Sequence, residues 1–327
     1  MQRAPKLISA ESVLLVTEAY NVAEGQSEAS LIRAVSDLEA IAARHNNAAV
    51  AVIDPNLEGV AKPLLSATHP HIDVWHLPSQ SYDGQKNFIS QNAQSELIVF
   101  LDGDCHPLYD SWLDKLLAPF ADVTVSAVGG TTLYEDFSLA GVAMTILDFG
   151  YLFGNSGQAL GCYASNNVAF RRKTLLEVPI PHDGEMRCLC YKHAQMLQRA
   201  HKPVLLEGGA VVVHELPDIE KERHRRGYDH VAALWTDPQL AETSWLSDPQ
   251  TARFRIMFQN WNLALDRLKL APPELNITRI GYKKIVEEIS RLMLMDEAGI
   301  ASALEFGEVN GLNQRALVAN KALCEIS

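Results

Sequence analysis

The sequence lacks the features of a membrane-spanning or secreted protein. It has no run of about 18 or more apolar residues, which a membrane-spanning helix needs. The closest stretch, 139–153, is interrupted by Asp148. Residues 1–9 contain Arg3 and Lys6 but no long apolar stretch and no cleavage site. We therefore expect neither a secretory signal nor a membrane span.

Cysteine is scarce, with five cysteines in 327 residues. An odd number of cysteines scattered through a chain of this length argues against a disulfide framework. Cys188 and Cys190 are too close in sequence to pair comfortably, and they lack the spacing of a metal site. We interpret all five as free thiols, which predicts a cytoplasmic location.

Positive charge is also scarce, since 28 Lys and Arg face 40 Asp and Glu and leave a formal net charge of -12. An acidic surface repels phosphate backbones, so we expect no nucleic-acid partner. A single nucleotide can still bind where a metal ion supplies local positive charge. The hydrophobic content of 47% is ordinary for a globular protein, and the chain is long enough to bury a sizeable core.

From residue 12 to residue 102, short apolar runs alternate with segments of helical periodicity. This alternation predicts a parallel sheet with helices on both faces. Ligands of such sheets bind at the carboxyl ends of the strands, where we expect the loops 17–21, 54–56 and 102–106 to meet. The expected strands are 12–17, 48–54, 72–76 and 97–102, and the expected helices are 29–44, a short one after Asn56, and 84–94.

The rest of the chain changes character. We expect strands at 123–130 and 204–214, helices at 139–153 and 185–200, and amphipathic helices from Trp245 onward, broken at Pro272 and Pro273. This pattern predicts an α/β domain over 1–240 and a helical C-terminal extension over 241–327.

Two apolar surfaces have alternative interpretations. The helix 139–153 either packs in a core or touches a membrane surface peripherally. The extension has an apolar stripe that we expect to be covered, because exposed stripes of that size are a liability. Its cover is either the core or a second subunit of a homo-oligomer. The stripe consists of Phe254, Met257, Phe258, Trp261, Leu265 and Leu268.

A pair of carboxylates ends the fourth expected strand, where Asp102 and Asp104 are separated by Gly103. Buried charges need a partner or a metal ion, and carboxylate oxygens favour Mg²⁺ or Mn²⁺. Such an ion would bridge the diphosphate of a nucleotide. The simpler alternative is an ordinary polar turn.

An ordered set of motifs resembles the inverting family 2 glycosyltransferases of the GT-A fold, over about residues 12 to 230. The resemblance implies a GT-A-like, Rossmann-type mixed and mainly parallel sheet flanked by helices. It also implies transfer of a sugar from a nucleotide-sugar donor, with a UDP-sugar favoured, to a carbohydrate or lipid-linked acceptor. The motifs are VLLVTEAYN at 13–21, GQKN at 84–87, LIVFLDGDCHP at 97–107, NNVAFRR at 166–172, VVVH at 211–214 and HRRG at 224–227.

The resemblance assigns roles to individual residues. Asp104, Asp102 and His214 would hold Mn²⁺ or Mg²⁺. The residues that would contact the nucleotide are Thr17, Glu18, Asp54, Lys86, Asp102, Arg225 and Arg226, the last two from a basic loop over the diphosphate. Each has a structural alternative: Asp54 as a helix cap, Lys86 as a solvated helix residue, His214 as a strand-end histidine, and the arginines as a solvated charged face.

One element of the family pattern is missing. Relatives have a Glu-Asp pair, whose Asp is the general base, at the start of the helix before the last core strand. Leu189 and Cys190 occupy those positions here. The nearest carboxylates are Asp183 and Glu185, and we favour Glu185 as the base, because proximity to the acceptor decides which group can act. Alternatively, both only cap the helix.

Two other functions compete with the transferase. A sugar-1-phosphate nucleotidyltransferase normally has Arg and Lys in a loop after its first strand, and residues 17–25 contain neither. A non-catalytic nucleotide- or carbohydrate-binding module is favoured by the missing Glu-Asp pair.

Overall fold

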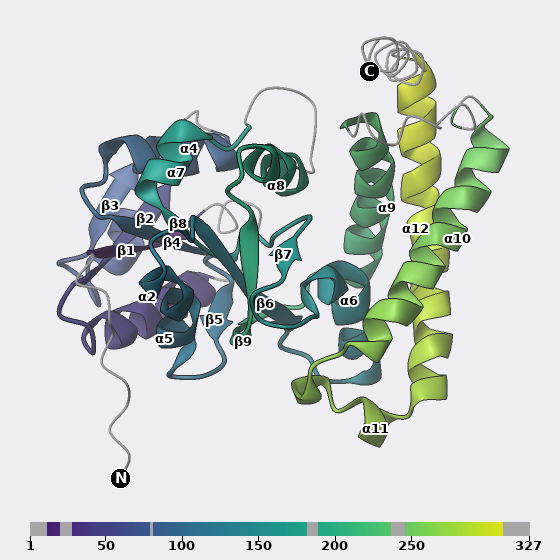
Figure 1. Cartoon of the computed structure of the whole chain (residues 1–327), viewed down its shortest axis with the longest axis horizontal. Helices are drawn as coiled ribbons and strands as arrows, with labels where there is room; N and C mark the ends of the chain where they lie inside the picture. Colours follow the sequence, from purple (N-terminus) through teal and green to yellow (C-terminus); the bar gives the residue numbers. More distant parts are fainter. Residues whose placement is uncertain are drawn as a thin grey trace. The chain divides into compact units, whose positions relative to one another are not determined.

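The computed structural model describes residues 12–19, 28–78, 81–181, 189–236, 246 and 248–309. Within these residues the backbone contacts separate two compact units (Figure 1). The α/β unit contains the described residues of 12–133, 154–181 and 189–215. The helical unit contains those of 134–153 and 216–309.

The first four strands are parallel, as the alternation of strand and helix predicted. They are β1 (Val13–Glu18), β2 (Ala48–Asp54), β3 (Asp73–His76) and β4 (Leu97–Leu101). Their order in the sheet is β3-β2-β1-β4. Val13 pairs with Ala48 on one side and with Leu97 on the other, so the carboxyl ends of β1, β2 and β4 lie at the same edge.

The remaining strands continue the same sheet in the order β8-β6-β9-β5, and β7 pairs with β9. The pairs β4–β8, β6–β8, β5–β9 and β7–β9 are antiparallel, which confirms a mixed sheet. These strands are β5 (Cys105–Pro107), β6 (Ala127–Tyr134), β7 (Ala159–Leu160), β8 (Asn167–Arg171) and β9 (Val204–His214).

The predicted start of one strand is wrong, because β6 begins at Ala127 and not at residue 123. The carboxylate of Asp122 accepts hydrogen bonds from Thr124 N at 2.8 Å and from Thr124 Oγ1 at 2.7 Å. This local Asx-type turn uses the groups that would otherwise begin the strand.

Helices cover both faces of the sheet. In Figure 1, α4 and α7 lie on one side of the strands, and α2 and α5 lie on the other. Helix α4 begins at Tyr82, two residues before the predicted start, because Ser81 Oγ accepts a hydrogen bond from Gly84 N and caps the helix. The helices of this unit are α2 (Glu28–Ala42), α3 (Ala61–Leu65), α4 (Tyr82–Asn92), α5 (Trp112–Leu117), α7 (Arg172–Glu177) and α8 (Leu189–Arg199).

In the helical unit, α12 packs against α6, α9 and α10. Its helices are α6 (Leu139–Phe149), α9 (Ile219–Thr236), α10 (Pro249–Lys269), α11 (Ile277–Ile280) and α12 (Tyr282–Val309). A Cβ at Gly227 would lie 2.1 Å from the Asp296 carbonyl oxygen, and one at Gly299 would lie 1.9 Å from the His224 carbonyl oxygen. These two glycines therefore let the backbones of α9 and α12 touch.

The predicted basic loop at 224–227 is wrong, since these residues lie inside α9. Glu222 pairs with Arg225 and Arg226, one turn further along the helix. Such pairs at i, i+3 and i, i+4 stabilise a helix. Gly227, at the end of this motif, packs against the backbone of α12.

The prediction for one of the two apolar surfaces is confirmed, and the prediction for the other is partly wrong. Residues 141–149 of α6 are all buried, which confirms the core alternative for this helix. The prediction that the apolar stripe on α10 is covered was partly wrong, because Phe254 and Phe258 are 70% and 56% exposed. The residues that α10 buries are Ala252, Ile256, Ala264 and Leu268. Among the described residues, no helix combines the length and apolarity that crossing a bilayer requires.

Candidate active site

The carboxyl ends of β1, β2 and β4 bring four predicted residues to one edge of the sheet. Thr17, Glu18, Asp54 and Asp102 stand at or directly after these ends, and all four are buried. Thr17 Oγ1 has no hydrogen-bond partner among the described residues. Buried polar side chains normally have partners, so this edge has the character of a ligand site.

Asp102 is held by Tyr82, which lies outside the motifs of the family resemblance. Tyr82 Oη lies 2.7 Å and 2.8 Å from the two carboxylate oxygens of Asp102 and donates its hydrogen to them. Ser165 Oγ lies 3.0 Å from the same hydroxyl. Burial, followed by the charges of Asp102 and Glu18, raises the pKa of Tyr82 well above its ordinary value. The phenol therefore stays protonated and remains a donor.

Lys86 completes this cluster and is not a solvated helix residue, since only 2% of it is exposed. Its Nζ donates to Tyr82 Oη at 2.6 Å and to the Ser165 carbonyl at 2.9 Å. It also lies 3.5 Å from Asp102 Oδ1. A buried ammonium group next to a buried carboxylate compensates its charge. The sequence contained a signal for Tyr82, because residues four apart on a helix share a face; it contained none for Ser165.

Gly103 fixes the loop between the two aspartates. A Cβ at this position would lie 2.3 Å from the carbonyl oxygen of Glu18, so any larger residue would push the loop away from the end of β1. The motif therefore needs glycine for a close backbone approach, which holds Asp102 and Asp104 against the neighbouring strand.

Asp104 faces His214, as the resemblance implied. Asp104 Oδ2 lies 3.5 Å from His214 Nε2, and 1% of Asp104 is exposed. His214 Nδ1 lies 2.6 Å from the carbonyl oxygen of Glu215, which can only accept, so Nδ1 donates. With a proton on Nδ1 alone, the ring carries a lone pair on Nε2, the atom that lies 3.5 Å from Asp104 Oδ2. A carbonyl that fixes the tautomer in this way is typical of metal-binding histidines.

Cys105 lies beside Asp104 and His214. One ligand atom each from Asp104, Cys105 and His214 lie within 4.8 Å of one another. The thiol of Cys105 lies 3.7 Å from Asp104 Oδ1 and is fully buried in the core of the sheet. Burial, followed by the charge of Asp104, raises the pKa of Cys105 well above its ordinary value. The protonated thiol therefore donates to Asp104.

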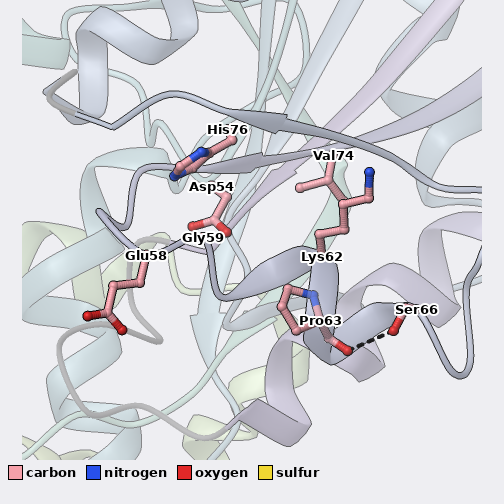
Figure 2. Close-up of a pocket in the computed structure, with 8 residues that line it drawn as sticks. All are labelled: Asp54, Glu58, Gly59, Lys62, Pro63, Ser66, Val74 and His76. Carbon is pink, nitrogen blue, oxygen red and sulfur yellow. Dashed lines mark hydrogen bonds between the residues drawn. The ribbon is translucent and has the colours of Figure 1, made fainter.

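Asp54 caps a helix, as its structural alternative proposed. Its Oδ2 accepts from Ala61 N, the first residue of α3, at 2.7 Å. Its Oδ1 accepts from Asn56 N at 3.1 Å and from Asn56 Nδ2 at 2.7 Å. The nucleotide contact stays a prediction. Asp54 also lines an open pocket of about 520 Å³, together with Glu58, Gly59, Lys62, Pro63, Ser66, Val74 and His76 (Figure 2).

Arg225 and Arg226 belong to the helical unit, where they form ion pairs. Arg225 contacts Glu222 and lies 3.1 Å from Asp229 Oδ2. Arg226 Nε lies 2.8 Å from Glu222 Oε1 and 3.6 Å from Asp148 Oδ1. Burial raises the pKa of Glu222, but the two arginines outweigh it and lower that pKa to about 2. The predicted diphosphate contact of these arginines stays a prediction.

The two candidate bases, Asp183 and Glu185, lie outside the described residues, so their roles stay predictions. Helix α8 is described from Leu189, followed by Cys190, at the positions where the resemblance expects carboxylates. On the other side of the segment, the side chain of Asn87 binds the backbone of Ile180. It accepts from Ile180 N at 2.9 Å and donates to Ile180 O at 2.7 Å.

Comparison with known proteins assigns the fold. No protein-family model and no curated protein matches the chain. The mannosyltransferase PcManGT from Pyrobaculum calidifontis, in complex with GDP-Man and Mn²⁺, is similar with a TM-score of 0.59 and 16% identity over 92% of this chain and 88% of its own. Glucosyl-3-phosphoglycerate synthase from Mycobacterium tuberculosis follows at 0.49 and 13%, covering 70% of this chain and 80% of its own. GalNAc-T7 with UDP, GalNAc and Mn²⁺ has 0.48 and 12%, covering 69% and 51%. The chain therefore has the GT-A fold that its motifs predicted.

Proposed function

We propose that this protein is a metal-dependent glycosyltransferase that moves a sugar from a nucleotide donor to an acceptor hydroxyl with inversion at the anomeric carbon. The observation that carries the proposal is the approach of Asp104 Oδ2 to His214 Nε2, 3.5 Å apart, at the ligand-binding edge of a GT-A sheet. The fold supplies the nucleotide-binding crevice, and the two side chains supply ligands for a cation.

The two ligands fit a cation of the size of Mg²⁺ or Mn²⁺. Atoms bound to one Mg²⁺ at about 2.1 Å each lie at most about 4.2 Å apart, and the 3.5 Å separation falls within this limit. A carboxylate and a neutral imidazole suit Mn²⁺ in particular. When bound, the cation would neutralise the charge that develops on the departing diphosphate.

The cluster around Asp102 would serve the nucleotide. Because Tyr82 and Lys86 hold this carboxylate in place, we assign Asp102 to the ribose hydroxyls and Asp104 to the metal. The hydroxyl of Thr17 and the carboxylate of Glu18 are the polar side chains at the carboxyl end of β1. Preorganised groups of this kind bind a ligand without paying for their own ordering at that moment.

The donor is a nucleotide sugar. The sequence resemblance favours UDP-sugars, whereas the solved mannosyltransferase holds GDP-Man. Arg225 and Arg226 are our candidates for diphosphate contact. On the acceptor side, Glu185 would take the proton of the attacking hydroxyl, with Asp183 as the alternative.

A binding module without turnover is the second candidate function. The observation that favours it is the start of α8, where Leu189 and Cys190 occupy the positions of the family's Glu-Asp pair. Without a base, the same site would bind a nucleotide sugar and leave it intact.

Donor cleavage separates these functions. The protein is incubated with UDP-glucose, UDP-GlcNAc and GDP-mannose, with Mn²⁺ or with a chelator, and released nucleoside diphosphate is measured beside thermal unfolding. A transferase releases diphosphate from one donor only when Mn²⁺ is present. A binding module shows a metal-dependent rise in melting temperature without release. Absence of both effects for every donor contradicts the proposal, and release of pyrophosphate from a nucleoside triphosphate and a sugar phosphate would identify a nucleotidyltransferase.

A further inference from the structure

Two cysteines of the α/β unit lie against each other, although 28 residues separate them in the sequence. The Sγ atoms of Cys162 and Cys190 are 3.7 Å apart. Cys162 follows β7, and Cys190 lies in the first described turn of α8. Both side chains are half-buried, so reagents can reach them. We expected all five cysteines to be free thiols, and their spacing in the sequence gives no sign of this pair.

Hydrogen bonds on either side of the pair hold the two segments together. The carbonyl of Gly161 accepts from Gln195 Nε2 at 3.1 Å. The hydroxyl of Tyr163 lies 2.7 Å from His193 Nδ1. Gly161 and Tyr163 flank Cys162, and Gln195 and His193 follow Cys190 along α8. The approach of the two sulfurs is therefore part of a continuous contact.

The tautomer of His193 makes the Tyr163 contact directional. His193 Nε2 lies 2.8 Å from the Val178 carbonyl and must donate to it, so Nδ1 accepts the hydrogen of Tyr163. Burial lowers the pKa of His193 to about 4, which keeps the ring neutral at physiological pH. The ring therefore fixes α8 against the segment that carries Cys162.

We propose that Cys162 and Cys190 are a redox-active dithiol, which a low-molecular-weight disulfide oxidises to an intramolecular disulfide that ties α8 to the segment after β7. A disulfide has an S–S bond of about 2.05 Å, so the sulfurs have to approach by about 1.7 Å from their present 3.7 Å. Rotation about the Cα–Cβ bonds of two half-buried side chains can supply this movement.

The reaction is thiol–disulfide exchange in two steps. With glutathione disulfide, one cysteine thiolate attacks a glutathione sulfur, the glutathione S–S bond breaks, and one glutathione thiolate leaves. The second cysteine thiolate attacks the cysteine sulfur of this mixed disulfide and displaces the other glutathione. Two cysteine thiols are oxidised, one glutathione disulfide is reduced, and the two thiol protons end on the two glutathione molecules.

Cys105 has the opposite environment, which makes the proposed modification selective. Its side chain is buried in the core of the sheet. Reactive cysteines need access to the reagent, which Cys105 lacks.

The link would lie at one end, in sequence, of the segment that carries both candidate bases. Asp183 and Glu185 lie in sequence between Ile180, which Asn87 holds, and Cys190. Oxidation would therefore add a covalent anchor at one end of the segment that carries both candidate bases. This consequence rests on the proposed function; the disulfide does not.

Mass spectrometry tests the dithiol directly. The full chain is incubated with glutathione disulfide, remaining thiols are alkylated, and the digest is searched for linked peptides. We expect a Cys162–Cys190 peptide, an intact mass lower by two hydrogens, and a melting temperature higher by about 3 °C or more that dithiothreitol reverses. Persistent glutathione adducts without a link, a link to another cysteine, or a lower melting temperature in the oxidised form overturns the proposal.

Three single variants complete the experiment. Cys162→Ser and Cys190→Ser each remove the link and leave a stable glutathione adduct on the remaining cysteine, because no second thiol displaces it. Cys188→Ser is the matched control, since it lies two residues from Cys190 and should form the link as the natural chain does. If Cys188→Ser loses the link, the pair has been assigned wrongly.

Discussion

The hydroxyl of Tyr82 lies 2.7 Å and 2.8 Å from the two carboxylate oxygens of Asp102, and it accepts a hydrogen bond from Lys86 at 2.6 Å. Asp102 is therefore occupied by partners from α4, while Asp104 faces His214. The two aspartates of one short motif have different neighbours, which is why we assign one to the nucleotide and the other to the metal.

Tyr82→Phe tests the first assignment. The variant removes the hydrogen bond that orients Asp102 and leaves the ring in place. A hydrogen bond to a charged group contributes about 1–2 kcal/mol, so we expect nucleotide diphosphate to bind about 5–30-fold more weakly, with its metal dependence retained. Calorimetry with Mn²⁺ measures both. Tyr109→Phe, at a tyrosine that is 40% exposed, is the control, and equal affinity in all three proteins would show that Tyr82 has no part in binding.

Most of the parallel half of the sheet could be predicted because β1, β2 and β4 are mainly apolar runs. Strand β2 has the predicted bounds, 48–54, since an apolar run that ends at a polar residue has a clear limit. The antiparallel strand β9 also has its predicted bounds, 204–214. The approach of Asp104 to His214 could be expected as well, because the family resemblance placed both residues at one metal site.

Partners supplied by tertiary contacts could not be predicted. A lysine on a helix is normally exposed to solvent, and only the packing of α4 next to Asp102 explains the burial of Lys86. The segment 224–227 resembles a basic loop, but Glu222 and the packing of Gly227 on α12 favour a helix. On α10 the buried residues are Ala252, Ile256, Ala264 and Leu268, and the apolar character of Phe254 and Phe258 alone does not show that they lie on the other side of the helix.

The helical unit should show a pH-dependent stability that originates at Asp296. Burial raises the pKa of this carboxyl from 3.8 to about 7, although Arg223 Nε lies 3.3 Å away. The folded state then holds a proton that the unfolded chain releases, so the stabilising contribution is complete below about pH 4 and is lost as the pH rises through about 7.

Asp296→Asn removes this titration. When the pH rises from 5 to 8, the free energy of unfolding of the natural chain should fall by on the order of 2–3 kcal/mol more than that of the variant. Denaturant unfolding at both pH values measures this difference. Glu297→Gln, one residue along α12, is the control and should give no such difference. If the free energies of unfolding of Asp296→Asn and of the natural chain change equally with pH, the Asp296 carboxyl does not titrate in this range.

Glu185→Gln tests the general base. The substitution removes the basic oxygen and should lower kcat by about 10²–10⁴-fold with little change in donor affinity, because the metal ligands are untouched. Steady-state kinetics with the donor found in the cleavage assay measures both values. If Asp183→Asn shows the loss and Glu185→Gln does not, the assignment passes to Asp183. Full activity in both variants would place the base outside this segment.

The exposed phenylalanines of α10 test the predicted oligomer. Phe254 and Phe258 stack with ring centroids 6.2 Å apart and planes 9° from parallel. If a second subunit covers them, replacing both by Ser should shift the molar mass in light scattering from a dimer to a monomer. Leu57→Ser, at another exposed apolar residue, should leave the mass unchanged. A monomer for the natural chain at high concentration would contradict the oligomer.

Metal-dependent nucleotide binding by an Asp104 variant tests the central claim most directly. Calorimetry compares the natural chain, Asp104→Ala and the control Asp110→Ala, whose side chain is 95% exposed, with UDP and GDP in Mn²⁺ and in chelator. We predict that Mn²⁺ tightens binding of one nucleotide at least about tenfold, or 1.4 kcal/mol, in the natural chain and in Asp110→Ala. In folded Asp104→Ala this gain should disappear. If Asp104→Ala keeps the full gain from Mn²⁺, Asp104 does not hold the metal and the proposed active site is wrong.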